Sequence, residues 1–385
     1  MRKLNWAALL PLLLTGCEFQ SYKDYGTPEY DGAFEWTRVT KSAAWSNRWD
    51  HSSVAFDSKL WVMGGYGPGS VQGDSYLEDV WSSQDGETWN QVSSSAPWLG
   101  RRGHASVVFD DGSGEAIYLI GGFEVNEETG YRQYTNDVWR SIDGAEWTRI
   151  KERTYPELDS IFDWPPRFNH TCVVAQHGGI DYIYLIGGSA MMEDSLGKSR
   201  YAMKYFNDVW RSVDGVTWEA LPNSDFGIRS EHAACVDPAT GRIYIQGGRF
   251  GVIFEREVDQ AEPIANWRWL WSSADGINWM PAHDTAVVEE SLLHRAEHQL
   301  VYFNNSLFGL PGESANNVHH LFSDPPNYAF WRRDEGNLWS VDSEGSDFGA
   351  RYGYTSVVHD NKLWILGGEN NFHGPDNDVW YGEIK

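Results

Sequence analysis

The sequence contains 385 residues with a formal net charge of −25, and phenylalanine, tryptophan and tyrosine make up 15% of it. This aromatic content, with 21 tryptophans, excludes a disordered chain and is sufficient for a large buried core. The acidity argues against a nucleic-acid-binding or polybasic membrane-binding surface, so we expect no nucleic-acid partner.

The first residues predict a secretory signal that ends at a lipid attachment site. Arg2 and Lys3 precede an apolar run that is far shorter than the ~20 residues of a membrane-spanning helix. Its end, Leu14-Thr15-Gly16-Cys17, resembles the bacterial lipobox, whose cysteine is lipidated and becomes the mature N-terminus. The resemblance implies cleavage of residues 1–16. The alternative is a plain cleaved signal with an incidental cysteine.

Residues 17–33 follow as the lipidated cysteine and a tether, because they show no periodicity. The resemblance to lipoproteins implies attachment in the bacterial cell envelope. Glu18 stands where an aspartate commonly retains lipoproteins at the inner membrane, so we expect the outer membrane, with the protein facing the periplasm or the surface.

The rest of the chain, residues 34–385, consists of repeats. An apolar run ending in paired glycines recurs at Gly65, Gly122, Gly188, Gly248 and Gly368, with a degenerate copy ending at Gly312. An arginine precedes each copy, followed in five of the six by a histidine three residues later. Downstream come an aromatic strand such as Asp79-Val80-Trp81 and a segment of the form Ser-x-Asp-Gly-x-x-Trp. Each unit predicts four short strands.

Two features of the repeat predict its local structure. Asp-Gly between aromatic strands is typical of a tight hairpin in which both central residues take positive φ. We expect the glycine pair at a place where a side chain would obstruct the backbone, and the tryptophans of the last two strands between neighbouring units.

Arg-x-x-His, an apolar strand, Gly-Gly, an aromatic residue and a final tryptophan together resemble the kelch repeat. The resemblance spans residues 34–385 six times and implies an all-β fold, a six-bladed kelch-like β-propeller. The sixth repeat stops after its third strand, at Asn377–Lys385. We therefore expect the stretch Phe34–Val39, which reads like a fourth strand, to close the ring in the last blade of a monomeric propeller.

The kelch resemblance implies that the repeat arginines begin the innermost strands and, with the residues after Gly-Gly, contact ligands at the central channel. Such a positive ring would attract a carboxylate or another anion. The alternative, which we favour, is that each arginine pairs with an acid and holds the blades together. The candidate ligand-binding residues are Arg48, Arg101, Arg167, Arg229, Arg295 and Arg351, with Tyr66, Phe123, Arg249, Phe250 and Trp267.

Other residues carry weaker predictions. The five repeat histidines (His51, His104, His170, His232 and His298) occupy equivalent places and cannot all converge on one metal, so we assign them packing or hydrogen-bonding roles. Cys172 and Cys235 are expected to be buried free thiols on opposite strand faces. We expect no metal and no cofactor.

The sequence therefore predicts a binding module that recognises an envelope protein or glycan through one propeller face. The alternative is a sugar-modifying enzyme resembling the kelch-type sialic-acid mutarotase or a glycosidase, in which Glu231 and Glu297 could act as acid or base. A third possibility is a structural spacer. Long segments after Gly-Gly in the third and fourth repeats are the expected recognition loops.

Overall fold

The computed structural model describes residues 32–68, 74–126, 130–154, 162–193, 201–222, 224–249, 270–282, 295–314, 329–333, 339–343, 347–349, 351–370 and 374–385. The predicted signal peptide, Cys17 and nearly all of the tether lie outside these residues, as do Phe250 and Trp267. Within the described ranges, no helix has the length and apolarity needed to cross a membrane.

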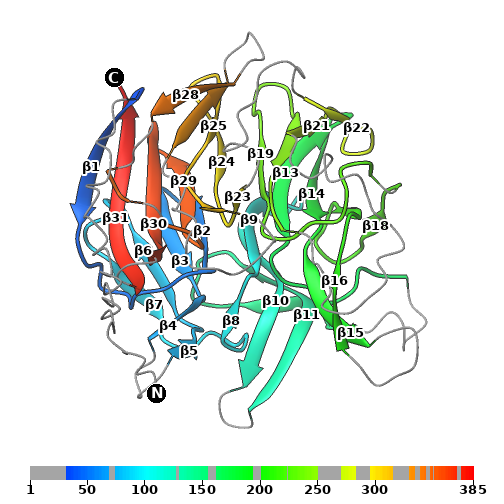
Figure 1. The fold of residues 1–385 in the computed structure, drawn as a ribbon. Coiled ribbons are helices and arrows are strands. Elements are labelled where there is room, and N and C mark those ends of the chain that lie inside the picture. Colours follow the sequence, from blue (N-terminus) through cyan, green and yellow to red (C-terminus); the bar gives the residue numbers. More distant parts are fainter. Residues whose placement is uncertain are drawn as a thin grey trace, which may run out of the picture.

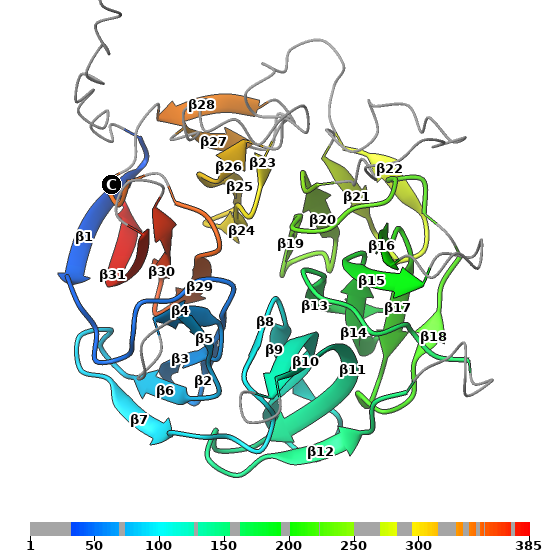
Figure 2. The same ribbon diagram turned by 60° about the horizontal axis from the view of Figure 1, so that its bottom comes forward.

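The described strands form six antiparallel blade sheets around a central axis, five of four strands and one of five, which confirms the predicted all-β, six-bladed propeller (Figures 1 and 2). Blade one contains β2 (Ser52–Phe56), β3 (Lys59–Met63), β6 (Val80–Ser83) and β7 (Asn90–Ser93), and blade two contains β9 (Ala105–Asp110), β10 (Glu115–Asn126), β11 (Tyr131–Ser141) and β12 (Thr148–Lys151). Blade three contains β13 (Thr171–His177), β14 (Ile180–Ile186), β17 (Val209–Ser212) and β18 (Glu219–Ala220), and blade four contains β19 (Ala233–Val236), β20 (Ile243–Gln246), β21 (Trp271–Ser273) and β22 (Trp279–Pro281). Blade five contains β24 (Leu300–Phe303), β25 (Ser306–Gly309), β27 (Phe330–Arg333) and β28 (Trp339–Ser343), and blade six contains β29 (Thr355–His359), β30 (Lys362–Asn370), β31 (Gly374–Ile384) and β1 (Phe34–Thr40).

Short strands add a second layer beyond the glycine pairs. β4 (Tyr66–Pro68) pairs with β5 (Asp74–Tyr76), and β15 (Ser189–Glu193) pairs with β16 (Tyr201–Tyr205). β23 (Arg295–Ala296) pairs with β26 (Glu313–Ser314), and β8 (Arg101–Arg102) pairs with the second half of β10. Figure 1 shows β4, β5, β15 and β16 on the same face of the ring.

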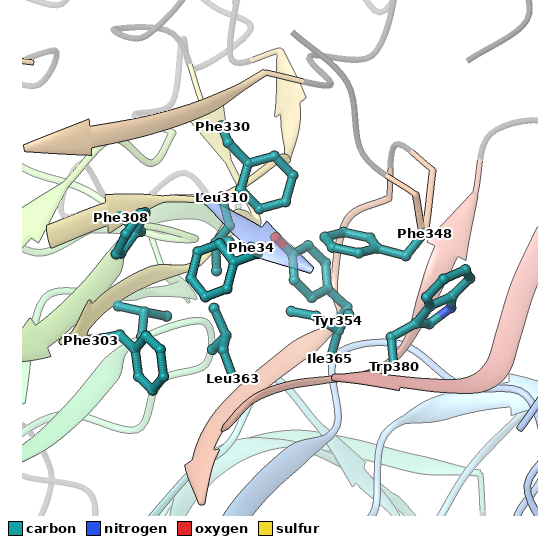
Figure 3. Packing of buried hydrophobic residues seen from close by; sticks show 11 residues of the cluster. Phe34, Phe303, Phe308, Leu310, Phe330, Phe348, Tyr354, Leu363, Ile365 and Trp380 are labelled. Carbon is teal, nitrogen blue, oxygen red and sulfur yellow. The ribbon is translucent and has the colours of Figure 1, made fainter. Parts of the chain in front are cut away.

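The N-terminal strand closes the propeller, as the missing outer strand of the sixth repeat predicted. β1 pairs antiparallel with β31, from Phe34 opposite Ile384 to Thr40 opposite Val379, and extends one residue beyond the predicted Phe34–Val39. Phe34 is fully buried in the cluster between blades five and six, where its ring lies 4.9 Å from that of Phe308 (Figure 3). Closure therefore covers the edge of β31 and also fills the core.

The Ser-x-Asp-Gly-x-x-Trp segments form tight turns, although not with two positive φ angles. In blade two, the Ser141 hydroxyl accepts the Gly144 N–H at 2.8 Å, and Asp143 accepts the next two backbone N–H groups at 2.9 Å each. The glycine alone takes positive φ, at 72°. A Cβ on Gly144 would lie 2.1 Å from the Trp61 ring of blade one, so the turn packs directly on its neighbour.

Apolar side chains of the described residues fill each of the six junctions between blades. Trp139 and Trp147, from the third and last strands of blade two, pack between blades one and two, as predicted. Trp98 contacts Trp147 edge-on at 6.0 Å, and the equivalent Trp45 contacts Trp89 at 5.8 Å. Large rings thus fill the wedge that opens between sheets radiating from an axis.

Candidate functional site

The six repeat arginines are buried inside their blades, and four of them pair with an acid, as the structural alternative predicted for all six. Arg48, Arg101, Arg167, Arg229 and Arg295 are 0% exposed and Arg351 is 3% exposed, which corrects the expectation that these residues form a positive ring open to a ligand. Four bind the aspartate of their own blade's third strand: Arg48–Asp79 at 2.7 Å, Arg101–Asp137 at 2.8 Å, Arg167–Asp208 at 2.6 Å and Arg351–Asp378 at 2.6 Å.

Backbone carbonyls receive the remaining guanidinium donors. Arg48 donates to Gly64 O at 2.9 Å, and Arg229 donates to Gly247 O at 3.1 Å. Burial alone would raise the pKa of Asp137 and of Asp208, but the paired arginines outweigh it and lower both pKa values. Aspartates thus neutralise four of the six arginines, and hydrogen bonds from all six to backbone carbonyls hold parts of their own blades together.

The repeat histidines are neutral, and three of the five link neighbouring blades by hydrogen bonds. Burial, followed by the repulsion of nearby arginines, lowers the pKa of His104 to about 3. His104 Nε2 lies 2.8 Å from the Ser52 hydroxyl of the preceding blade. The same bond joins His232 to Thr171 and His51 to Thr355, each at 2.9 Å. These bonds agree with the packing and hydrogen-bonding roles that we predicted. We call the six arginines and five histidines the belt.

A closed ring of backbone hydrogen bonds surrounds the central channel. The residue two positions after each belt arginine donates its N–H to the carbonyl of the equivalent residue in the preceding blade, at 2.7–3.3 Å. All six adopt positive φ between 51° and 60°. They are Asp50, Gly103, Asn169, Glu231, Glu297 and Gly353. This ring fixes the radius of the channel and turns the side chains at these positions toward it.

Three positions in each blade surround the end of the channel: the two after the belt arginine and the one after Gly-Gly. The first and third of these pair across the backbone in all six blades. We call these positions the channel mouth. They hold Trp49, Asp50 and Tyr66; Arg102, Gly103 and Phe123; Phe168, Asn169 and Ser189; Ser230, Glu231 and Arg249; Ala296, Glu297 and Glu313; and Tyr352, Gly353 and Glu369.

Aromatic side chains occupy the mouth at blades one to three. Tyr66 contacts Trp49 at 4.7 Å between ring centroids, and Phe123 lies 6.2 Å from Phe168. Tyr76 of β5 bridges the first pair to the second, at 4.8 Å from Tyr66 and 5.6 Å from Phe123. These half-buried rings form a continuous apolar wall along one side of the mouth.

Charged side chains gather around the mouth, mostly at blades four to six. Arg102 binds Asp50 at 3.1 Å, and Arg249 binds Glu231 at 2.7 Å and also Glu313. Burial, opposed by Arg102 and Arg249 and assisted by Glu231 and Glu369, raises the pKa of Asp50 to about 6. Burial and the nearby Glu231 and Asp50 raise the pKa of Glu297 well above its ordinary value.

The channel beneath the mouth contains a cavity of about 150 Å³. Its lining includes Asp50, Glu231 and Glu297 from the backbone ring and the five belt histidines. Within the described residues, no group of three or more histidine, cysteine, aspartate or glutamate side chains is placed to hold a metal ion. The cavity therefore offers hydrogen-bonding and acid–base groups in a small space that opens at the channel.

The structure places the sequence candidates in two separate layers. Tyr66, Phe123 and Arg249 lie at the mouth, whereas the belt arginines lie within the blades. The sequence analysis missed Asp50 and Arg102, although Asp50 occupies the same repeat position as Glu231 and Glu297, which it did single out. Comparing all six residues at that position would have found it.

Both cysteines of the described chain are free, as predicted, and only partly exposed. Cys172 packs in the cluster between blades two and three, and Cys235 packs in that between blades four and five. The two thiols therefore point to opposite faces of their sheets. Burial raises the pKa of both thiols, so they remain protonated.

Comparison with known proteins supports the propeller assignment. The kelch motif model matches residues 350–381, in blade six. The comparison with curated proteins gives no match. Among solved structures, that of YjhT is similar, with a TM-score of 0.60, 14% sequence identity and coverage of 89% of this chain and 96% of that one. At this identity the similarity shows a shared fold alone. The chain is therefore a six-bladed β-propeller that carries a kelch motif in its sixth blade.

Proposed function

We propose that the protein is a binding module, tethered in the bacterial envelope, that recognises a protein or glycan partner through its channel mouth. The observation that carries this proposal is the contrast between the belt and the mouth. Belt positions repeat nearly the same residue in every blade, whereas the mouth positions after Gly-Gly hold tyrosine, phenylalanine, serine, arginine and two glutamates. Positions that are equivalent in backbone but different in side chain are suited to recognition, because they do not hold the fold together.

The mouth also offers the groups that binding sites use. Half-buried aromatic rings supply apolar contact area at low conformational cost, and tyrosines and arginines are enriched where binding energy concentrates. Arg102 lies over the Tyr66 ring at 5.5 Å, which holds its guanidinium in place. A partner therefore meets a largely preformed surface.

Site-directed photocrosslinking in the bacterial envelope tests this proposal. A photoreactive phenylalanine analogue replaces Tyr76 at the mouth or, as a control, Met280, which is 57% exposed on the outer strand β22. We expect a discrete adduct from position 76 that is absent from position 280. The purified partner should then bind the wild-type protein and lose affinity for Arg102→Gln but not for Arg149→Gln, a half-exposed outer-strand control. Identical adducts at both positions, or none, would refute binding through the mouth.

The tether is proposed from the lipobox-like residues and has its own test. We expect the intact protein to fractionate with outer membranes and its N-terminal peptide to carry acyl chains by mass spectrometry. Cys17→Ser should lose the lipid and move to the soluble envelope fraction. Membrane retention of Cys17→Ser would contradict lipid attachment at this residue.

A sugar-modifying enzyme is the second candidate, and the channel carboxyls favour it. Asp50 and Glu297 have raised pKa values, as a carboxyl that donates a proton near neutral pH requires. Anomeric exchange of sialic and uronic acids by NMR, together with release of aryl glycosides, measures the two activities. Turnover by the wild type that Glu297→Gln abolishes would favour the enzyme. No turnover at high protein concentration would refute it.

A further inference from the structure

The two arginines of the channel mouth offer little positive charge to a ligand, because acids already hold them. Arg102 binds Asp50, and Arg249 binds both Glu231 and Glu313. The belt arginines are buried beside their own acids or backbone carbonyls. Acids therefore neutralise both mouth arginines and four of the belt arginines, whereas backbone carbonyls hold Arg229 and Arg295 inside their blades.

Carboxylates outnumber cations at the mouth. Its positions hold two arginines against five acids: Asp50, Glu231, Glu297, Glu313 and Glu369. Among the described residues, no hydrogen bond or ion pair reaches the Glu297 carboxyl. Glu297 lines the cavity and belongs to the backbone ring that turns toward the channel. Arg249 and Arg102 act on the Glu297 carboxyl without forming an ion pair with it, so a ligand cation could make the direct contact.

His298, next to Glu297 in sequence, provides a second and independent indication. It is 2% exposed, lines the same cavity, and neither ring nitrogen has a hydrogen-bond partner among the described residues. His104 and His232 bind hydroxyls of the preceding blade, but the position facing His298 is Ala233. Burial, followed by Arg295, lowers the pKa of His298 to about 3, so the ring is neutral and keeps a nitrogen that accepts hydrogen bonds.

The volume of the cavity and the aromatic wall beside it favour an extended side chain over a sugar ring as the ligand. The cavity of about 150 Å³ is well below the roughly 300–1,000 Å³ of typical small-molecule pockets, so it suits an extended side chain better than a sugar ring. The aromatic wall on the opposite side of the mouth offers π-faces and apolar surface to the stem and charge of a lysine or arginine.

We infer that the channel mouth binds a lysine or arginine side chain in a basic segment of a partner protein. The cationic head enters the channel, where Glu297 and Asp50 pair with its charge and His298 accepts one of its hydrogen bonds. The rings of Tyr66, Phe123 and their neighbours contact the rest of the segment. This inference rests on the proposed binding function and specifies its partner.

Calorimetric titration of residues 18–385 with defined peptides tests the inference. The probes are acetyl-trilysine amide, the same peptide with acetylated side chains, acetyl-triglutamate amide and a glucosamine dimer. We expect trilysine alone to bind. Glu297→Gln removes the carboxyl that would pair with the cation, with little change in side-chain shape, and should weaken trilysine binding about tenfold, in keeping with a charge-assisted hydrogen bond. The matched control is Glu383→Gln on β31, which removes a surface carboxyl and should leave binding within about twofold.

Asp50→Asn provides a second variant if Glu297→Gln folds poorly, because blade three already has asparagine at this position. It should weaken trilysine binding about fivefold or more. Equal losses for Glu297→Gln and Glu383→Gln would overturn the inference as non-specific attraction to an acidic protein. Preferential binding of triglutamate, of acetylated trilysine or of the glucosamine dimer would also overturn it. A mouth-specific crosslink without trilysine binding would leave the binding function standing, whereas the absence of that crosslink would count against the function itself.

Discussion

The belt and the channel mouth lie a few residues apart along the same strands, yet they follow opposite rules. The belt repeats arginine and histidine around the ring, and most of them bind an aspartate, a serine or a threonine at an equivalent place. The mouth varies from blade to blade and leaves the Glu297 carboxyl without a hydrogen bond or a direct ion pair among the described residues. The comparison teaches that residues repeated in every blade of this propeller hold the fold together. Residues that differ between equivalent positions are available for function.

The largest effect should follow from breaking the belt at Arg101→Ala. This substitution leaves Asp137 and Glu124 buried without their shared cation, which should lower the free energy of unfolding by about 3–5 kcal/mol. Urea or thermal unfolding measures the loss. Arg149→Ala, which removes a surface pair with Glu152, should change stability by no more than about 0.5 kcal/mol. Similar losses for the two variants would show that the belt pair is not structural.

Phe34→Ala should also destabilise the fold, by about 3–4 kcal/mol, because it empties a fully buried site in the junction that closes the ring. Unfolding curves quantify this loss, and hydrogen exchange should show that β31 loses protection first. Exchange that rises evenly over all blades would contradict a local role in closure.

The Asp50→Asn variant tests the channel mouth through the pH dependence of the free energy of unfolding. Burial raises the pKa of Asp50 to about 6, against the opposing Arg102 and Arg249 and together with Glu231 and Glu369. The folded protein therefore holds this proton more tightly than the unfolded chain, and Asp50 costs stability as pH rises from about 4 to about 6.

The variant lacks this titration. It should gain about 1–2 kcal/mol relative to the wild type above pH 6 and show no gain below about pH 4. Unfolding measured across this pH range tests the difference between the two proteins. A gain that stays constant with pH would mean that Asp50 does not titrate as described.

The smallest change in stability is expected from a substitution that gives His298 a hydrogen bond like that of His104. Ala233→Ser places a hydroxyl opposite His298, as Ser52 lies opposite His104, and should stabilise the protein by about 0.5–1 kcal/mol. Ala234→Ser, on the opposite face of the same strand and packed in the next cluster, should give no gain. Equal effects of the two serines would show that His298 is not the group being satisfied.

The sequence predicted the features that recur from blade to blade and the strand that the last repeat lacks. Five Gly-Gly copies with one degenerate copy, and four Ser-x-Asp-Gly-x-x-Trp segments, predicted the blades, and the absent outer strand of the sixth repeat predicted β1. The Asp-Gly turn was predicted with two positive φ angles, but Asp143 instead uses its carboxylate to accept two backbone N–H groups.

The channel mouth was harder to predict, because its composition differs in every blade and a repeat search discards what does not repeat. One signal was available. The position two residues after the belt arginine holds Asp50, Gly103, Asn169 and Gly353, residue types that tolerate positive φ, and this conformation turns the chain toward the channel. Which acids pair with Arg102 and Arg249 depends on contacts between blades, which no local pattern encodes.

The pairing of β1 with β31 also bears on the order of events during folding. Blade six joins the beginning of the folded domain to its far end, so the earliest strand to emerge must wait for the latest before its sheet can form. Contacts so distant in sequence form late, because most of the chain must already be arranged. Five blades can assemble in succession, but the ring gains its final junction in a single step. Until then an incomplete chain exposes the edge of β30 or β31, which would let quality-control proteases distinguish it from the finished propeller.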